Sequence, residues 1–157
     1  MTLIVNEENS ERVKLAGMIK DNLDKAGFDI LVVSLPYDQF ESRLASRQFD
    51  MYIAGYNMSV YPELSFMFNS RNAVDGTNYS DYMDPAMDKL LSAAFSAGDA
   101  GRQAAITAVL NYISDNNVCV PIAFRVSAAA SSSRLHAELT AWPGSLYDNI
   151  NTWYLTS

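Results

Sequence analysis

The fold is decided by residues 3–57, which read LIVNEENSERVKLAGMIKDNLDKAGFDILVVSLPYDQFESRLASRQFDMYIAGYN. Short apolar runs alternate in this segment with stretches whose apolar residues recur at helical spacing. The runs predict strands and the recurring pattern predicts amphipathic helices. The order strand, helix, strand, helix, strand implies right-handed crossovers and therefore a parallel sheet covered by helices. The predicted elements are strands at 3–5, 28–34 and 50–56, and helices at 11–25 and 37–48.

Residues that begin and end helices support these boundaries. Asn9 or Ser10 is expected to cap the first helix, and Gly27 is expected to end it. Before the second helix, Ser34 is a possible cap and Pro36 fits the first turn. Local signals and hydrophobic periodicity therefore agree in this part of the chain.

The middle of the chain predicts two more helices. Asp84 is expected to cap a helix that starts at Pro85 and ends before Gly98. A further helix is expected at 100–114, with Leu110 among its inward residues.

The remainder predicts two more strands. Residues 118–124, VCVPIAF, form a nearly continuous apolar run that predicts a strand covered on both faces, or partly at an edge because Pro121 lacks an N–H. Residues 150–155, INTWYL, predict a closing strand. We therefore expect an α/β fold, with helices packed on a mostly parallel sheet, in a single domain that spans residues 1–157.

Composition excludes several classes of function. The chain has 157 residues and a net charge of −7, with 18 acidic and 11 basic residues. The basic residues form no cluster, so nucleic acid is not an expected partner. No apolar run approaches the ~20 residues that span a bilayer, and the N-terminus does not resemble a signal peptide. If the natural protein is exported, its signal is expected to lie outside this chain.

No sequence motif indicates catalysis, a metal or a cofactor. His136 and Cys119 are the only residues of their types, and a closed zinc site would need two carboxylates in addition. Glycine-rich motifs for dinucleotides or phosphates are absent. Four acids lie close together, but no window matches a calcium loop, so solvated loops and a helix cap explain them. These acids are Asp75, Asp81, Asp84 and Asp88.

The segment after the third predicted strand is unusual for a loop. It carries no charged residue between Asp50 and Glu63, and it is rich in Tyr, Asn, Met and Ser. Open α/β sheets bind ligands at the carboxyl ends of their parallel strands. The segment is therefore predicted to face a ligand.

Taken in order, the elements resemble the last lobe of bacterial extracellular solute-binding proteins of the oligopeptide, dipeptide and nickel type (family 5), which serve ABC importers. The resemblance begins in residues 3–57 and continues through residues 84–124, DPAMDKLLSAAFSAGDAGRQAAITAVLNYISDNNVCVPIAF. The latter segment shows an acid-Pro start, a helix with Asp-Lys-Leu-Leu, an Arg-containing helix and an apolar strand with Pro. The resemblance extends to YDNINTWYL, residues 147–155, and so covers nearly the whole chain.

The resemblance implies one lobe, the C-terminal one, of a type II periplasmic-binding-protein-like fold within a longer parent chain. Its ligand would be a peptide or another small molecule, held between this lobe and the N-terminal lobe of the same parent chain. Its other partners would be the permease subunits of an ABC transporter. The resemblance further implies an extracytoplasmic location, periplasmic or as a cell-surface lipoprotein, and a binding protein rather than an enzyme.

The resemblance also implies site residues. In the family, the segment after the third strand reads Gly-Trp, two variable residues, an acid that holds a peptide's amino terminus, and an aromatic residue. Here Gly55 is kept, Tyr56 stands in place of Trp, and Ser59 stands in place of the acid. Side chains just after the Pro-containing strand also enter the family's cleft. The expected ligand-binding residues are Tyr56, Asn57, Met58, Ser59, Tyr61, Phe124 and Arg125.

Two alternatives come from other classes of function. One is a small α/β hydrolase that uses acids at the strand ends, such as Asp50 or Asp81. The other is an interaction module that docks a transporter or receptor subunit through its helices.

Overall fold

The computed structural model describes residues 1–157 except 59–61, 125–127, 129, 138–146, 148 and 157. The described residues form two compact units, Met1–Cys119 and Val120–Ser157. The single domain over residues 1–157 remains a prediction.

The first unit begins with a three-stranded sheet in the order β2-β1-β3, and both strand pairs are parallel, as predicted. The strands are β1 (Thr2–Asn6), β2 (Leu31–Leu35) and β3 (Met51–Ile53). β3 is shorter than the strand predicted at 50–56. Ile53 pairs with Val5, next to the end of β1, so the chain beyond Ile53 runs out of a neighbouring strand to pair with.

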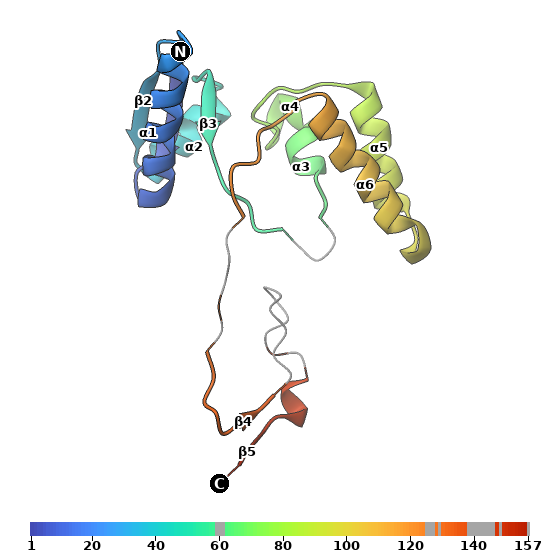
Figure 1. Ribbon diagram of the computed structural model, residues 1–157. Coiled ribbons are helices and arrows are strands. Elements are labelled where there is room, and N and C mark those ends of the chain that lie inside the picture. The colour runs from blue at the N-terminus through green and yellow to red at the C-terminus, as the bar shows by residue number, and fades with distance from the viewer. Residues whose placement is uncertain (59–61, 125–127, 129, 138–146, 148, 157) are drawn as a thin grey trace. The chain divides into compact units, whose positions relative to one another are not determined.

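The sheet is covered on both faces, because successive side chains of a strand point to opposite sides. Leu3 and Val5 pack with Ala16 of α1 (Ser10–Lys25), whereas Ile4 packs with Phe40 of α2 (Tyr37–Ala45). Figure 1 shows α1 on the near side of the sheet. The central strand is therefore buried from both sides, and Ile4 has no exposed surface.

The ends of these two helices confirm some predicted caps and correct others. Asn9 caps α1 by accepting a hydrogen bond from the Arg12 N–H at 3.0 Å, and Gly27 adopts the positive φ of 92° after its end. Ser34 lies in β2 and caps nothing. Instead, Glu8 Oε1 accepts a hydrogen bond from the Tyr37 N–H at 2.8 Å, so a distant carboxylate satisfies the start of α2.

The other described elements of the first unit are helices. It contains α3 (Ser65–Phe68), α4 (Arg71–Asp75), α5 (Pro85–Ser96) and α6 (Asp99–Asp115). Their core consists of Leu64, Phe68, Met87, Leu91, Val109 and Ile113. The sequence predicted α5 and α6, but Leu110, expected inward, is 49% exposed.

Arg47 joins the helical part to the part with the sheet. It follows α2 and has a positive φ of 57°. Its Nε pairs with Asp81 at 2.8 Å, and its Nη2 donates to the carbonyl oxygens of Ala73 at 2.8 Å and Asn78 at 3.1 Å. The guanidinium also lies 5.3 Å from the ring centre of Tyr79.

Asp84 caps α5 as predicted and also binds α6. Its Oδ1 accepts from the Ala86 N–H at 2.8 Å, and its Oδ2 accepts from the hydroxyls of Tyr112 at 2.6 Å and Tyr82 at 3.1 Å. The Tyr112 hydroxyl, followed by the Ala86 N–H, holds the pKa of Asp84 below its usual value.

The second unit holds a small antiparallel pair, β4 (Leu135–His136) with β5 (Tyr154–Leu155), and the 3-10 helix η1 (Ile150–Thr152). The predicted closing strand is therefore confirmed only in its last residues. The covered strand predicted at 118–124 is wrong, because those residues form no strand and Val120 and Phe124 are 80% and 89% exposed. Within the described residues this run has no neighbouring strand to pair with.

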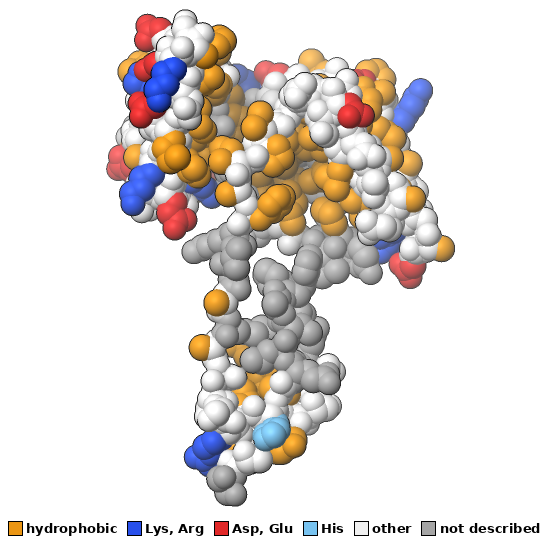
Figure 2. Space-filling model, viewed as in Figure 1, with side chains coloured by type: hydrophobic (Ala, Val, Ile, Leu, Met, Phe, Trp, Pro, Cys, Tyr) orange, Lys and Arg blue, Asp and Glu red, His pale blue; other side chains and the backbone are white. Residues whose placement is uncertain are grey.

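The surface carries charged side chains of both signs, as the composition predicts. Figure 2 shows side chains of both signs interspersed over the part of the chain that contains α1, on the face in view. Among the described helices, none has the length and apolarity needed to cross a membrane.

The substitution Ile4→Ala tests the central role of β1. It should lower the free energy of unfolding by about 2–5 kcal/mol, because it opens a cavity between β1 and α2. Urea unfolding followed by circular dichroism measures this. Leu31→Ala on the neighbouring strand is the control, since Leu31 is 63% exposed. Equal losses for the two variants would contradict the packing described.

The substitution Asp84→Asn tests the cap that joins α5 to α6. Because folding lowers the pKa of Asp84, its stabilising effect is present above the unfolded pKa and is lost as the pH falls through the folded pKa. The variant should therefore be less stable than the parent at pH 7, and the difference should shrink in acid. Thermal melts across pH measure this, with Asp115→Asn as the control. A difference that stays constant across pH would refute the role of the carboxylate.

Candidate functional site

The carboxyl ends of the three parallel strands meet at one edge of the sheet. β1 ends at Asn6 and β2 at Leu35, which pair with each other, and β3 ends at Ile53. Polar residues such as Glu8 follow β1, whereas Tyr37 and Tyr56 follow β2 and β3. At this edge the structure brings together the side chains of Asn6, Glu8 and Arg12.

Asn6 and Glu8 form the floor of this edge. Asn6 is only 6% exposed, and its Nδ2 donates to Glu8 Oε2 at 3.4 Å. The other oxygen of Glu8 accepts from the Tyr37 N–H. The hydrogen bond from the Tyr37 N–H is the main reason that the pKa of Glu8 lies below its usual value. Glu8 is therefore a carboxylate that binds the start of α2.

Arg12 lies beside them, in the first turn of α1. Its Nη1 donates to Asn6 Oδ1 at 2.9 Å. Its guanidinium packs against the backbone at Gly55, where an added Cβ would collide with Nη2 and lie 3.2 Å from Cζ. Glycine at position 55 thus permits the close approach of Arg12 to the segment that follows β3.

Tyr56 anchors the start of that segment. Its ring packs edge-on against Phe66 with the ring centres 5.0 Å apart, and 37% of the residue stays exposed. Burial is the main cause that raises the pKa of Tyr56, and the neighbouring Tyr52 raises it further. The hydroxyl is therefore neutral at physiological pH and serves as a hydrogen-bonding group.

The structure describes only part of the predicted ligand-binding set. Tyr56, Asn57 and Met58 follow β3 and are all exposed. Phe124 is 89% exposed in the second unit. The predicted residues Ser59, Tyr61 and Arg125 lie outside the described residues. The ligand-binding set therefore stays a prediction.

Asn6, Glu8 and Arg12 were missed by the sequence analysis. The same strand-end rule that selected Tyr56 applies to β1, whose carboxyl end is Asn6. This rule was the sequence signal that could have identified the three residues. Residues 6–12 also contain the start of a helix, and the capping signal there explains their polar character without a ligand.

The acids named for the hydrolase alternative have structural roles. Asp50 Oδ2 accepts from the Thr2 N–H at 2.6 Å, and Asp81 pairs with Arg47. His136 lies in β4 with its ring stacked on Tyr154, 4.8 Å between centres. Burial raises the pKa of the Cys119 thiol, which disfavours the thiolate. In the described part of the chain, no group of His, Cys, Asp or Glu is placed to hold a metal ion.

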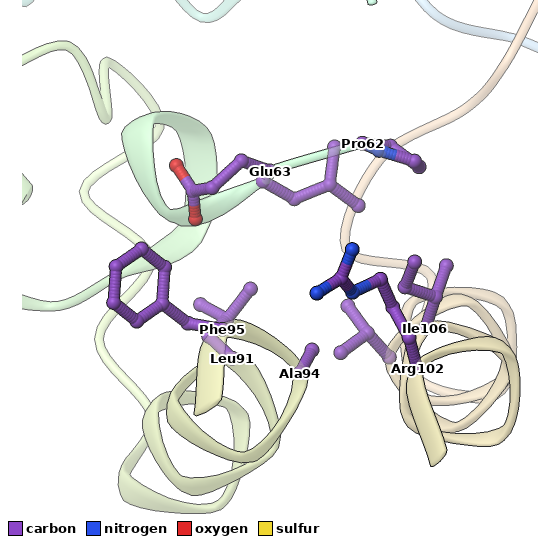
Figure 3. A pocket seen from close by; sticks show the side chains of 9 residues that line it. Pro62, Glu63, Leu91, Ala94, Phe95, Arg102 and Ile106 are labelled. Atoms are coloured by element: carbon purple, nitrogen blue, oxygen red, sulfur yellow. The ribbon is translucent and has the colours of Figure 1, made fainter. Parts of the chain in front are cut away.

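A separate pocket lies within the helical part of the first unit (Figure 3). It has a volume of about 210 Å³ and is mostly apolar. Figure 3 shows Arg102 on one side, and Phe95 and Glu63 on the other. Arg102 Nη1 pairs with Asp99 at 3.4 Å, and Arg102 Nη2 donates to the Ala97 carbonyl oxygen at 3.3 Å. The full lining is Pro62, Glu63, Leu64, Leu91, Ala94, Phe95, Arg102, Ile106 and Val109.

Comparison with known sequences finds a relative but no matching family model. The oligopeptide-binding protein AppA of Bacillus subtilis is 26% identical to this chain over 100 residues. The match covers 62% of this chain and 18% of AppA. The chain therefore spans about a fifth of that relative's length.

Comparison with solved structures shows the fold. AppA of Bacillus subtilis in complex with a nonapeptide matches 99% of this chain and 31% of its own, with a TM-score of 0.70 and 20% identity. The substrate-binding protein CtaP of Listeria monocytogenes matches 100% of this chain and 33% of its own, with a TM-score of 0.74 and 21% identity.

A third solved structure extends the comparison. It is the periplasmic binding protein DppA of Helicobacter pylori in complex with the peptide STSA. It matches 71% of this chain and 23% of its own, with a TM-score of 0.63 and 20% identity. These matches confirm the predicted α/β class and the resemblance to part of the substrate-binding proteins of ABC transporters. The relatives are binding proteins by name.

A double-mutant cycle tests the contact between Arg12 and Asn6. Removing either partner with Arg12→Ala or Asn6→Ala breaks the same hydrogen bond, so their effects on unfolding free energy should not add. We expect a coupling of about 1 kcal/mol, typical for a partly exposed bond to a charged group. Chemical unfolding of the parent, both single variants and the double variant measures it. Additive losses would contradict the contact.

Proposed function

We propose that this chain, which shares its fold with part of the substrate-binding proteins of ABC transporters, contributes one lobe of a solute-binding cleft. The solute is a peptide or a related small molecule. One observation carries the proposal: an uncharged segment with exposed Tyr56, Asn57 and Met58 follows β3 at the carboxyl edge of a parallel sheet. That edge is where open α/β sheets bind ligands.

The side chains suit binding without chemistry. Tyr56 offers a flat apolar surface with a neutral hydroxyl, and Asn57 can both donate and accept hydrogen bonds. Met58 is flexible and adapts to different apolar groups. Ser59 lacks the negative charge that would hold an ammonium group, so we infer that this position does not select a free amino terminus.

The chain would act together with more protein. It matches 18% of AppA in sequence and 31% of the AppA structure, so most of AppA has no counterpart in this sequence. We propose that an N-terminal lobe of the same parent chain closes the cleft and that the closed form docks on the permease subunits outside the cytoplasm. Transport would then depend on different affinities of the open and closed states for the solute, and not on turnover.

A titration tests this proposal. The isolated chain should give little heat with a panel of peptides, because one lobe encloses only part of a ligand, whereas a two-lobed parent should bind. Within that parent, Tyr56→Ala should weaken binding about tenfold or more, as loss of a buried aromatic anchor does. Isothermal calorimetry measures both effects.

Phe28→Ala is the matched control, because Phe28 is 51% exposed and lies before the amino end of β2, at the opposite edge of the sheet. Nanomolar binding by the isolated chain would refute the one-lobe proposal. Equal losses for Tyr56→Ala and Phe28→Ala would refute the location of the site.

A further inference from the structure

We propose that Arg12 is a specificity-determining residue of this site, and that the solute presents an anionic group, a carboxylate or a phosphate, to its guanidinium. The inference rests on the proposed function and adds a charge requirement to it. The observation behind it is a half-buried guanidinium fixed between Asn6 and Gly55 at the carboxyl edge of the sheet.

Arg12 is held in one place by its neighbours. Its backbone N–H is bound by Asn9, and its Nη1 is bound by Asn6, which is itself buried. Glycine at position 55 leaves room for the Arg12 guanidinium, and a side chain at position 55 would occupy that space. A guanidinium fixed in this way loses little entropy when it binds a ligand, so its donors are preorganised.

Most of the hydrogen-bonding capacity of Arg12 is not used by the described residues. Within the described residues, Nη1 is its only side-chain donor with an acceptor, and no carboxylate forms an ion pair with it. Arg47 provides the contrast, because its Nε, Nη1 and Nη2 all donate to acceptors within the first unit. Arg47 therefore serves the fold, whereas Arg12 has donors that no described residue accepts from.

Helix stability does not account for a cation at position 12. The first turn of a helix carries partial positive charge from its free N–H groups, so a cation there is unfavourable and an anion is favourable. The nearby carboxylate of Glu8 accepts from the Tyr37 N–H and the Asn6 amide. The start of α1 and Arg12 would therefore attract the same negative group.

The sequence around the site agrees with this charge preference. No acid lies between Asp50 and Glu63, so the segment after β3 adds no carboxylate to compete for Arg12. The planar fork of an arginine matches the two oxygens of a carboxylate or phosphate. A neutral solute would leave the guanidinium partly dehydrated without a partner when the cleft closes, which is costly.

Nuclear magnetic resonance of the ¹⁵N-labelled chain tests the inference, since it detects the weak binding expected of one lobe. The probes are N-acetyl-tetraalanine with a free carboxylate, the same peptide as its carboxamide, and inorganic phosphate. The free carboxylate should shift the Arg12 Nε–H and Gly55 N–H signals. The carboxamide should bind about tenfold more weakly, which is the loss of one charge-assisted hydrogen bond.

Variants separate the charge at position 12 from charge in general. Arg12→Gln should abolish the preference for the carboxylate, and Arg12→Lys should keep part of it. Lys14→Gln removes the same charge from an exposed position on the same helix and should change nothing. The backbone spectrum of each variant reports whether the variant is folded. The comparison of the two peptides uses the unsubstituted chain and needs no variant.

The outcomes distinguish this inference from the proposed function. Saturation of Arg12 by phosphate but not by the peptide carboxylate supports the anion site and identifies phosphate as the group. Equal affinities for carboxylate and carboxamide at Tyr56 and Asn57 overturn the inference and leave solute binding standing. A shift at Arg12 without any peptide effect at Tyr56 supports the anion site and counts against peptide binding. No shift at Arg12 with any anion overturns the inference.

Discussion

The central position of β1 is the constraint on which the rest of the first unit depends. Because β1 pairs with β2 on one side and β3 on the other, both crossover helices must lie across it. Leu3 and Val5 then face α1, and Ile4 faces α2. The strand is short, and its last residue, Asn6, is still buried where the apolar core ends. A buried amide at that point needs polar partners, and it finds them in Arg12 and Glu8.

Much of this fold could be predicted from the sequence because local and periodic signals agree in it. Asn9, Gly27 and Asp84 mark helix ends that the structure confirms, and their effect depends only on residues a few positions away. Failures occur where the partner is distant. α2 begins without a side-chain cap of its own, and the Glu8 carboxylate that replaces it comes from across the sheet, 29 positions earlier in the chain.

The same distinction explains what the sequence could say about the site. Tyr56, Asn57 and Met58 stand out in one contiguous segment, because an uncharged polar run after a strand is itself a signal. Arg12 does not stand out, since a charged residue in an amphipathic helix normally faces water. Its role becomes visible only when Gly55 and Asn6 are placed beside it, and neither contact follows from spacing. The strand predicted at 118–124 is wrong for a related reason. Its apolar composition predicts burial, but composition does not show whether a neighbouring strand is there to pair with it.

A fixed cation at the edge of a cleft would give closure a physical cause. In an open lobe the Arg12 guanidinium is partly in water, where its attraction for an anion is weak. When a second lobe covers the edge, the local dielectric falls and the same attraction grows, provided that the anion is present to compensate the lost hydration. A solute with the charge then binds the closed form more tightly than the open form, and only such a difference shifts the equilibrium between them. A solute without the charge can contact Tyr56 equally well and yet leave closure unfavourable, so Arg12 would select at the step of closing and not at the step of first contact.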